Sequence, residues 1–175
     1  MVVKLLNNEL AHENRAGAVY LNLRSPEDVE AAVDAIRHSV ALFDPSLDTN
    51  QFLIETMVED ARAEFLVGVK RQIGLGLALV VGSGGTEVDS LRDYRTLLLP
   101  SSDQQIHEAL SKLALTQRMN LKDATMSSLL SAVRSIVRFA EQHSARLVEL
   151  DVNPLILRES GDTVAVDALM RMSSS

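Results

Sequence analysis

The sequence predicts an α+β fold in which mostly antiparallel strands form groups and helices stand between those groups. Strand-like runs occur in clusters separated by short polar or glycine-containing breaks, as expected for antiparallel pairing. Segments with apolar residues at helical spacing lie between the clusters. The 175 residues contain no internal repeat and no low-complexity linker, and they fit one domain or two small lobes that share a core.

The first part of the chain is predicted to contain two strands and then a helix. Strands are expected at residues 2–6 and 18–23, joined by a polar loop at residues 7–16. Ser25 and Pro26 predict the start of the helix, because a hydroxyl can cap it and proline suits its first position. The apolar face of this helix is expected to consist of Val29, Val33, Ile36 and Val40.

The remainder of the chain is predicted to run from strands to helices and back to strands. Strand-rich segments are expected at residues 52–58, 63–72 and 75–82. Ser102 is a candidate cap for one helix, and a longer helix is expected from about Asp123. The final strands are expected at residues 145–152, 154–159 and 163–170.

Composition excludes several classes of function. A formal net charge of −7 disfavours nonspecific nucleic-acid binding, which depends on Lys and Arg neutralising phosphates. The absence of cysteine excludes disulfides, thiolate zinc sites and a thiol nucleophile. The longest apolar stretch, Ile73–Gly82, is far shorter than the ~20 residues that span a bilayer. We therefore expect a soluble chain, compatible with a cytoplasmic location, that binds neither nucleic acid nor membrane.

The motif with the clearest chemistry is Asp151-Val152-Asn153-Pro154, with Asp167 following after a predicted hairpin. Alternation along a strand places Asp151 and Asn153 on one face, and a strand running back would bring Asp167 beside them. Carboxylate and amide oxygens are the ligands that Mg²⁺ prefers, with further positions left for water and phosphate. The alternative is a plain turn, because Asn-Pro is common turn chemistry.

The segment ELDVNPLIL with the later VAVDALMRM resembles the closing part of the ATP-grasp domain in ADP-forming acyl-CoA synthetases and in the related succinyl-CoA synthetase β subunits. This resemblance implies that the chain binds ATP and Mg²⁺. It assigns magnesium coordination to Asn153 and Asp167, with Asp151 completing the metal cluster.

The resemblance extends to the N-terminal part of the chain. Lys4 lies in a run similar to the family's strand that carries a phosphate-binding lysine. The run HENRAGAV resembles the family's pattern His-Lys-x-x-x-Gly-Gly-Val, which implies that His12 accepts a phosphoryl group in transit and that Gly17 lets the backbone approach phosphate. Glu13 and Ala18 depart from this pattern. Read without the family, His12 is a surface-loop histidine.

Further matches imply contacts to the nucleotide. Residues 53–58 resemble the hinge strand that contacts adenine, which points to Glu55 and Met57, and Glu64 stands where the family has acidic groups near the adenosine. Arg71 is a candidate phosphate ligand. The alternatives are a plain buried strand for Met57 and a surface salt bridge for Arg71.

A glycine-rich run follows the strand expected at residues 75–82. Gly82, Gly84 and Gly85 resemble the family's Gly-x-Gly-Gly, and Asp93 matches an acid downstream of it. Three close glycines can turn backbone amides toward an anion. The alternative is a flexible turn.

We interpret residues 1–175 as a partial ATP-grasp domain with its N-terminal lobe truncated: residues 1–55 form part of a nucleotide-clamping lobe, and residues 56–175 a C-terminal lobe with the metal site. The implied reaction converts an acid, CoA and ATP to acyl-CoA, ADP and phosphate through a phosphohistidine. A CoA-binding and phosphohistidine domain, or an α subunit, is the implied partner, so activity of this chain alone is not expected. The alternative is a catalytically inactive ATP-grasp remnant acting as a binding or structural module. Association into a homo-oligomer is a separate expectation for the partners of this chain.

Overall fold

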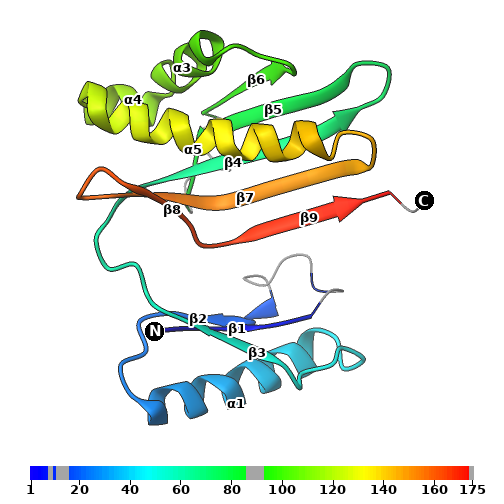
Figure 1. The fold of residues 1–175 in the computed structure, drawn as a ribbon. Helices are drawn as coiled ribbons and strands as arrows, with labels where there is room; N and C mark the ends of the chain where they lie inside the picture. The colour runs from blue at the N-terminus through cyan, green and yellow to red at the C-terminus, as the bar shows by residue number, and fades with distance from the viewer. Residues whose placement is uncertain (8–9, 11–15, 86–92, 174–175) are drawn as a thin grey trace. The chain divides into compact units, whose positions relative to one another are not determined.

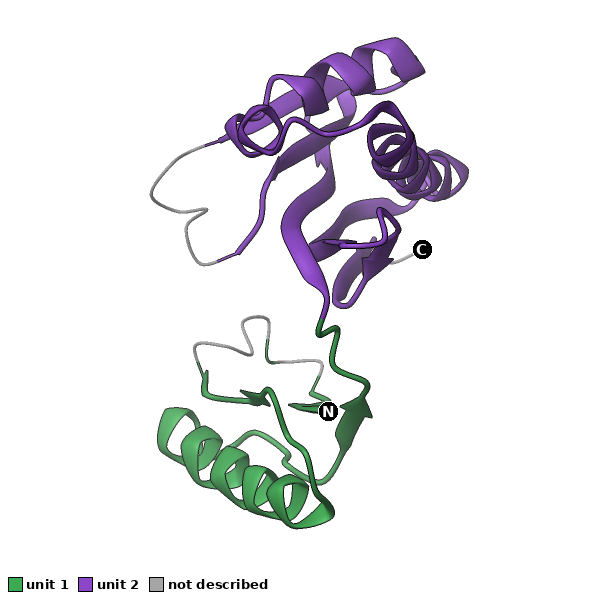
Figure 2. Ribbon diagram, turned by 90° about the vertical axis from the view of Figure 1, so that its left-hand side faces the viewer, with its two compact units in different colours: residues 1–59 green, residues 60–175 purple. Residues whose placement is uncertain are grey.

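The computed structural model describes the chain except for residues 8–9, 11–15, 86–92 and 174–175. The fold divides into two compact units, residues 1–59 and residues 60–175, coloured separately in Figure 2. The sequence-based boundary between lobes was four residues earlier, after residue 55. None of the helices in the described part of the chain is long and apolar enough to cross a membrane.

Unit 1 pairs a small sheet with one helix. Its described strands form an antiparallel sheet in the order β2-β1-β3, and helix α1 packs on this sheet. The elements are β1 (Val2–Leu5), β2 (Val19–Tyr20), α1 (Pro26–Phe43) and β3 (Phe52–Glu55). The fully buried side chains at the interface between sheet and helix are those of Val3, Leu5, Ala18, Ile36 and Val40.

Helix α1 begins where local chemistry predicts. The Ser25 hydroxyl accepts a hydrogen bond from the Asp28 backbone N–H at 3.1 Å, and the Asp28 carboxylate accepts one from the Ser25 N–H at 3.0 Å. This reciprocal capping box satisfies backbone donors that the first helical turn leaves unpaired. Pro26 occupies the first turn, where its missing N–H costs nothing.

Unit 2 is a larger antiparallel sheet with helices on one face. Its described strands follow the order β6-β5-β4-β7-β8, and β9 also pairs with β7. Figure 1 shows helices α3, α4 and α5 lying together on one side of this sheet. The strands are β4 (Ala61–Gln72), β5 (Gly76–Ser83), β6 (Tyr94–Leu98), β7 (Leu147–Arg158), β8 (Thr163–Ala165) and β9 (Ala168–Met172). The helices are α3 (Asp103–Ser111), α4 (Ala114–Met119) and α5 (Asp123–Gln142).

The core of unit 2 lies between the central strands and helix α5. Phe65, Val67 and Val69 alternate along β4 and are fully buried, in one cluster with Leu129 and Val133 of α5. A sheet that is covered on one face buries every second residue of its strands. The covering helix α5 buries residues at helical spacing in the same way. The intervening residues of β4, such as Leu66, Gly68 and Lys70, therefore project to the face that the helices of unit 2 leave uncovered.

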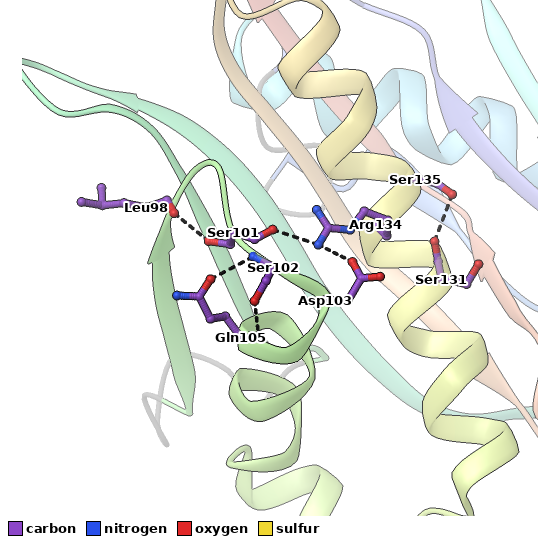
Figure 3. A network of polar contacts seen from close by, with 8 residues as sticks. All are labelled: Leu98, Ser101, Ser102, Asp103, Gln105, Ser131, Arg134 and Ser135. Atoms are coloured by element: carbon purple, nitrogen blue, oxygen red, sulfur yellow. Dashed lines mark hydrogen bonds and ion pairs between the residues drawn. The ribbon is translucent and has the colours of Figure 1, made fainter.

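A polar network ties α3 to α5 (Figure 3). Arg134 on α5 donates a hydrogen bond to the Ser101 carbonyl at 2.9 Å and forms an ion pair with Asp103 in the first turn of α3. Ser102 and Gln105 form a capping box at the start of α3. Ser102 was the predicted cap of this helix, and the structure confirms it. The helix ends at Ser111, and Leu113 is the N-cap of α4.

Strand β7 differs from the prediction that proline would end a strand at residue 152. It continues through Pro154, and the register changes there: Phe65 and Val67 of β4 face Leu155 and Val152 of β7. Asn153 and Pro154 of β7 thus lie opposite the single residue Leu66 of β4, which is a β-bulge. A bulge tolerates proline because the ladder is already interrupted at that point.

Candidate functional site

The uncovered face of the unit 2 sheet carries a row of charged side chains. Alternation along β4 places Glu64, Gly68 and Lys70 on this face, since the residues between them are buried in the core. Gly68 pairs with Asp151 of β7, and Lys70 pairs with Glu149. Two neighbouring carboxylates of β7 thus share the face with a glycine and a lysine of β4.

Gly68 provides room beside the Asp151 carboxylate. A Cβ added at residue 68 would lie 3.3 Å from Asp151 Oδ1, which is tighter than ordinary van der Waals contact. A side chain at this position would press on the carboxylate or force it aside. Glycine here leaves one flank of Asp151 open to a ligand.

The Asp151 carboxylate is held in an unfavourable electrostatic setting. Its pKa is raised above the ordinary value, first by burial and then by the negative charges of Glu149 and Asp167. Glu149 is itself compensated by Lys70 at 3.4 Å and by Arg171 of β9 at 3.0 Å. A cation bound at Asp151 would relieve the remaining repulsion.

The bulge in β7 places Asn153 and Asp167 next to each other. The Asn153 backbone N–H donates to the Asp167 carbonyl at 3.3 Å, and the Val166 N–H donates to the Pro154 carbonyl at 3.3 Å. These bonds fix the short connection between β8 and β9 against the bulge. Both Asn153 and Asp167 are exposed, whereas Asp151 is half-buried.

The backbones of Asn153 and Asp167 are therefore in contact, and the charge of Asp167 acts on Asp151. The three predicted metal ligands offer two carboxylates and one amide oxygen, a hard donor set that suits Mg²⁺, which keeps several waters and takes phosphate oxygens as further ligands. The described residues contain no group of three His, Cys, Asp or Glu side chains arranged to hold a metal.

The predicted nucleotide contacts of unit 1 lie on and beside its sheet. Lys4 on β1 is largely buried, and its Nζ lies 3.0 Å from Glu55 Oε2 on β3. Gly17 has a φ of +66°, and a Cβ there would lie 3.0 Å from the Ser39 Cβ on α1, so glycine is required at this turn. Met57 is half-buried beyond the end of β3. His12 and Glu13 lie outside the described residues.

Arg71 occupies a different environment from the predicted phosphate contact. Its Nε donates to the Leu147 carbonyl at 3.0 Å, and its Nη2 donates to the Ser144 carbonyl. These carbonyls lie at the first residue of β7 and in the turn that precedes it. By alternation along β4, Arg71 projects to the face that the helices cover, opposite to that of Lys70. The structure thus gives Arg71 backbone partners and separates it from the Asp151 cluster.

The predicted anion-binding turn at Gly82, Gly84 and Gly85 is also corrected in part. Gly82 lies within β5, paired with Leu66 and Tyr94. The Gly84 N–H donates to the Glu64 carbonyl at 2.7 Å, so it is not directed at a ligand. Sequence reasoning missed this contact, and it missed Gly68 and Glu149 as neighbours of Asp151. Strand alternation signalled the shared face of Glu149 and Asp151, but the pairing with β4 was needed to add Gly68.

Comparisons with known proteins agree with this arrangement. Residues 1–172 match the model of a family described as an ATP-grasp domain. The chain is 22% identical over 173 residues to the β subunit of the ADP-forming acetate–CoA ligase II of Pyrococcus furiosus, covering 96% of this chain and 73% of that subunit. It is 26% identical over 165 residues to an ADP-forming 4-hydroxybutyrate–CoA ligase of Nitrosopumilus maritimus, covering 92% of this chain and 23% of that protein.

A solved structure shares the fold. An acetyl-CoA synthetase of Candidatus Korarchaeum cryptofilum, in complex with coenzyme A and Ca-AMPCP, superposes with a TM-score of 0.86 at 22% identity. The match covers 98% of this chain and 76% of that one. The chain thus spans about three quarters of a separate β subunit and about a quarter of the longer single-chain ligase.

Replacing Arg71 by Lys tests whether the guanidinium serves the fold. Lysine cannot reach two carbonyls with a rigid fork, so we expect Arg71→Lys to lower the free energy of unfolding of unit 2 by about 1 kcal/mol. Urea denaturation measures this loss of stability. The matched control is Arg62→Lys, because Arg62 lies on an exposed part of the same strand. Weaker nucleotide binding at unchanged stability would instead indicate a phosphate contact.

Replacing Asp151 by Asn tests its electrostatic strain. The pKa of Asp151 in the folded state lies above the ordinary value of 3.8. At pH values above this raised pKa, the ionised carboxylate therefore destabilises the fold. Asp151→Asn should therefore increase the free energy of unfolding at pH 7 by roughly 0.5 kcal/mol, a figure discounted for solvent screening. The gain should shrink as pH falls toward 4, as the folded wild type takes up its proton.

Urea denaturation of both proteins at pH 7 and at pH 4 measures this difference. Asp162→Asn is the control, because Asp162 is an exposed carboxylate in the turn between β7 and β8. A loss of stability in Asp151→Asn at pH 7 would contradict the prediction.

Proposed function

This chain belongs to the ATP-grasp domain family, and on that premise we propose that it is the ATP- and Mg²⁺-binding part of an ADP-forming acyl-CoA synthetase. The complete enzyme would convert an acid, CoA and ATP to acyl-CoA, ADP and phosphate. Relatives that carry this domain are named as β subunits of such ligases or as longer single-chain ligases. These names support a role as one part of a larger catalytic assembly.

The observation that carries the proposal is the oxygen-donor cluster of Asp151, Asn153 and Asp167. Burial, and then the negative charges of Glu149 and Asp167, raise the pKa of Asp151, so the cluster gains from a bound cation. Magnesium bound there would neutralise phosphate charge during phosphoryl transfer. The open flank at Gly68 leaves space for the phosphate oxygens that would complete the coordination of the metal.

Other nucleotide contacts are proposed within each unit by itself. In unit 1, Lys4 would neutralise phosphate charge, Glu55 and Met57 would contact the base, and Gly17 would allow a close backbone approach. The ion pair between Lys4 and Glu55 holds both side chains on the same face of the β1–β3 sheet. In unit 2, Glu64 lies on the same face of β4 as Gly68, the partner of Asp151. Arg71 donates two hydrogen bonds to backbone carbonyls, and its contact with phosphate stays a prediction.

The proposed partner supplies the steps that an ATP site alone does not perform. A CoA-binding and phosphohistidine domain, or an α subunit, would deliver the acyl phosphate and CoA. His12 is proposed to accept the phosphoryl group in transit, because an imidazole nitrogen is a competent nucleophile.

The alternative is an ATP-grasp remnant that binds or supports a partner without transferring phosphate. Glu13 favours it, because a carboxylate would stand where the family's loop has a lysine. Ala18, the second departure, carries less weight. Its side chain is fully buried in the core of unit 1, and it is absent from the residues with positive φ, so an alanine is accommodated there.

Nucleotide binding tests the proposal directly. We expect ATP to bind this chain in isothermal titration calorimetry with Mg²⁺ present and to bind at least about tenfold more weakly without it, since the metal joins the carboxylates to the phosphates. Asn153→Ala and Asp167→Ala should each remove most of this Mg²⁺ dependence. The matched control is Asp162→Asn, because Asp162 is an exposed carboxylate outside the cluster. This variant should bind ATP like the wild type.

Two outcomes would count against the proposal. A folded wild-type chain that binds no ATP would favour the remnant. Binding that is equally tight with and without Mg²⁺, and unaffected by Asn153→Ala, would place the nucleotide away from the proposed metal cluster.

A further inference from the structure

The hairpin between β4 and β5 presents two large apolar residues to solvent at its tip, residues 73–75. The Leu75 N–H closes the turn by donating to the Gln72 carbonyl at 3.1 Å. Ile73 is fully exposed, and Leu75 is 64% exposed. Covering such a tip would remove both aliphatic side chains from water, which is favourable.

An open hollow of about 490 Å³ lies in unit 2 beside the base of this hairpin. Its apolar lining comes from the start of β5, from the two residues that follow β6 and from the turn after α5: Leu77, Leu99, Pro100 and Ala145. Gly76 of the hairpin also lines it, so the hairpin and the hollow are neighbours on one surface. Sites that bind small ligands have volumes of about 300–1,000 Å³, so the hollow has room for two aliphatic side chains.

The hollow also contains a carboxylate, that of Glu141 near the end of α5. Glu141 is half-buried, and its carboxylate forms no ion pair or hydrogen bond with any other residue that the structure describes. Arg71 lines the same hollow, but two of its donors are taken by the carbonyls of Ser144 and Leu147. An apolar occupant would strip water from the carboxylate, so the occupant that fits brings a hydrogen-bond donor as well.

The hairpin tip of a second copy of this chain has both properties. Ile73 and Leu75 supply aliphatic groups, and Gly74 lies between them. The Gly74 N–H donates to no other residue in the described part of the chain, so it is available to the Glu141 carboxylate of the other copy. Because tip and hollow are neighbours on one chain, a two-fold axis lets each copy insert its tip into the hollow of the other. Such an isologous contact closes on itself.

We infer that the hairpin tip of one copy docks in the hollow of a second copy, and that this reciprocal contact forms a two-fold dimer. The chain supplies both halves of the contact, whereas a different partner in the hollow would leave the tip uncovered. Every residue involved belongs to unit 2, and no nucleotide group takes part. The inference therefore stands apart from the proposed function and does not depend on ATP binding.

Analytical ultracentrifugation of the whole chain, over an about hundredfold range of protein concentration, tests for this dimer. We expect Ile73→Asp to raise the dissociation constant of the dimer at least about tenfold, because it replaces an apolar contact by a carboxylate facing Glu141. The matched control is Leu42→Asp, because Leu42 is 76% exposed on α1 and the substitution changes the net charge equally. This variant should dimerise like the wild type.

Two results of this measurement would overturn the inference. One is a wild-type chain that stays monomeric over the whole range of concentration. The other is an Ile73→Asp variant that dimerises as tightly as Leu42→Asp.

Disulfide cross-linking tests the contact itself, because the chain contains no cysteine of its own. Chains with Ile73→Cys are mixed with chains with Ala145→Cys, so that a bond between positions 73 and 145 must join two copies. Mass spectrometry of the joined peptides should find this bond at least about tenfold more often than the bond between positions 42 and 145 in a mixture of Leu42→Cys and Ala145→Cys chains, since a disulfide forms only between neighbouring backbones. Equal yields from the two mixtures would overturn the inference.

Discussion

Antiparallel pairing between β4 and β7 is the interaction on which unit 2 depends. These two strands form the centre of the sheet, and their pairing extends from Ala61 opposite Arg158 to Lys70 opposite Glu149. On one face, alternate residues such as Phe65 and Val67 pack against α5 and supply most of the burial. On the other face, the same pairing brings Gly68 beside Asp151. One face of this strand pair therefore contributes to stability, and the other face carries the candidate site. A shift of one residue in register would exchange the two faces.

The bulge at Asn153 and Pro154 adapts this strand pair to the metal site. The extra residue of β7 falls at Asn153 and Pro154, whose backbone groups hold the connection between β8 and β9 by hydrogen bonds. The result costs stability, because burial and the charges of Glu149 and Asp167 raise the pKa of Asp151. Strain of this kind is characteristic of sites that gain from binding a cation, and it gives the site a physical reason to favour the metal-bound state.

Much of the fold followed from local signals, while the errors came from contacts between distant residues. Ser25 and Ser102 were recognised as helix caps because a cap depends on residues only three positions away. Proline was expected to end a strand at residue 152, but the pairing with β4 turns this position into a bulge. The backbone partners of Arg71, the carbonyls of Ser144 and Leu147, could not be foreseen because they lie more than 70 positions away in the sequence. The metal cluster was predicted because its motif is local to β7 and the following hairpin, whereas the contact of Gly84 with Glu64 could not be read from either segment alone.

The central claim is that a divalent cation bound with nucleotide lies at Asp151, Asn153 and Asp167. Paramagnetic Mn²⁺ can replace Mg²⁺ in the presence of ATP. The backbone amide resonances that it broadens then locate the metal without relying on affinity. The account predicts that the amides of these three residues broaden first and that the broadening requires nucleotide. Broadening centred elsewhere in the chain, or none at all with ATP bound, would contradict it.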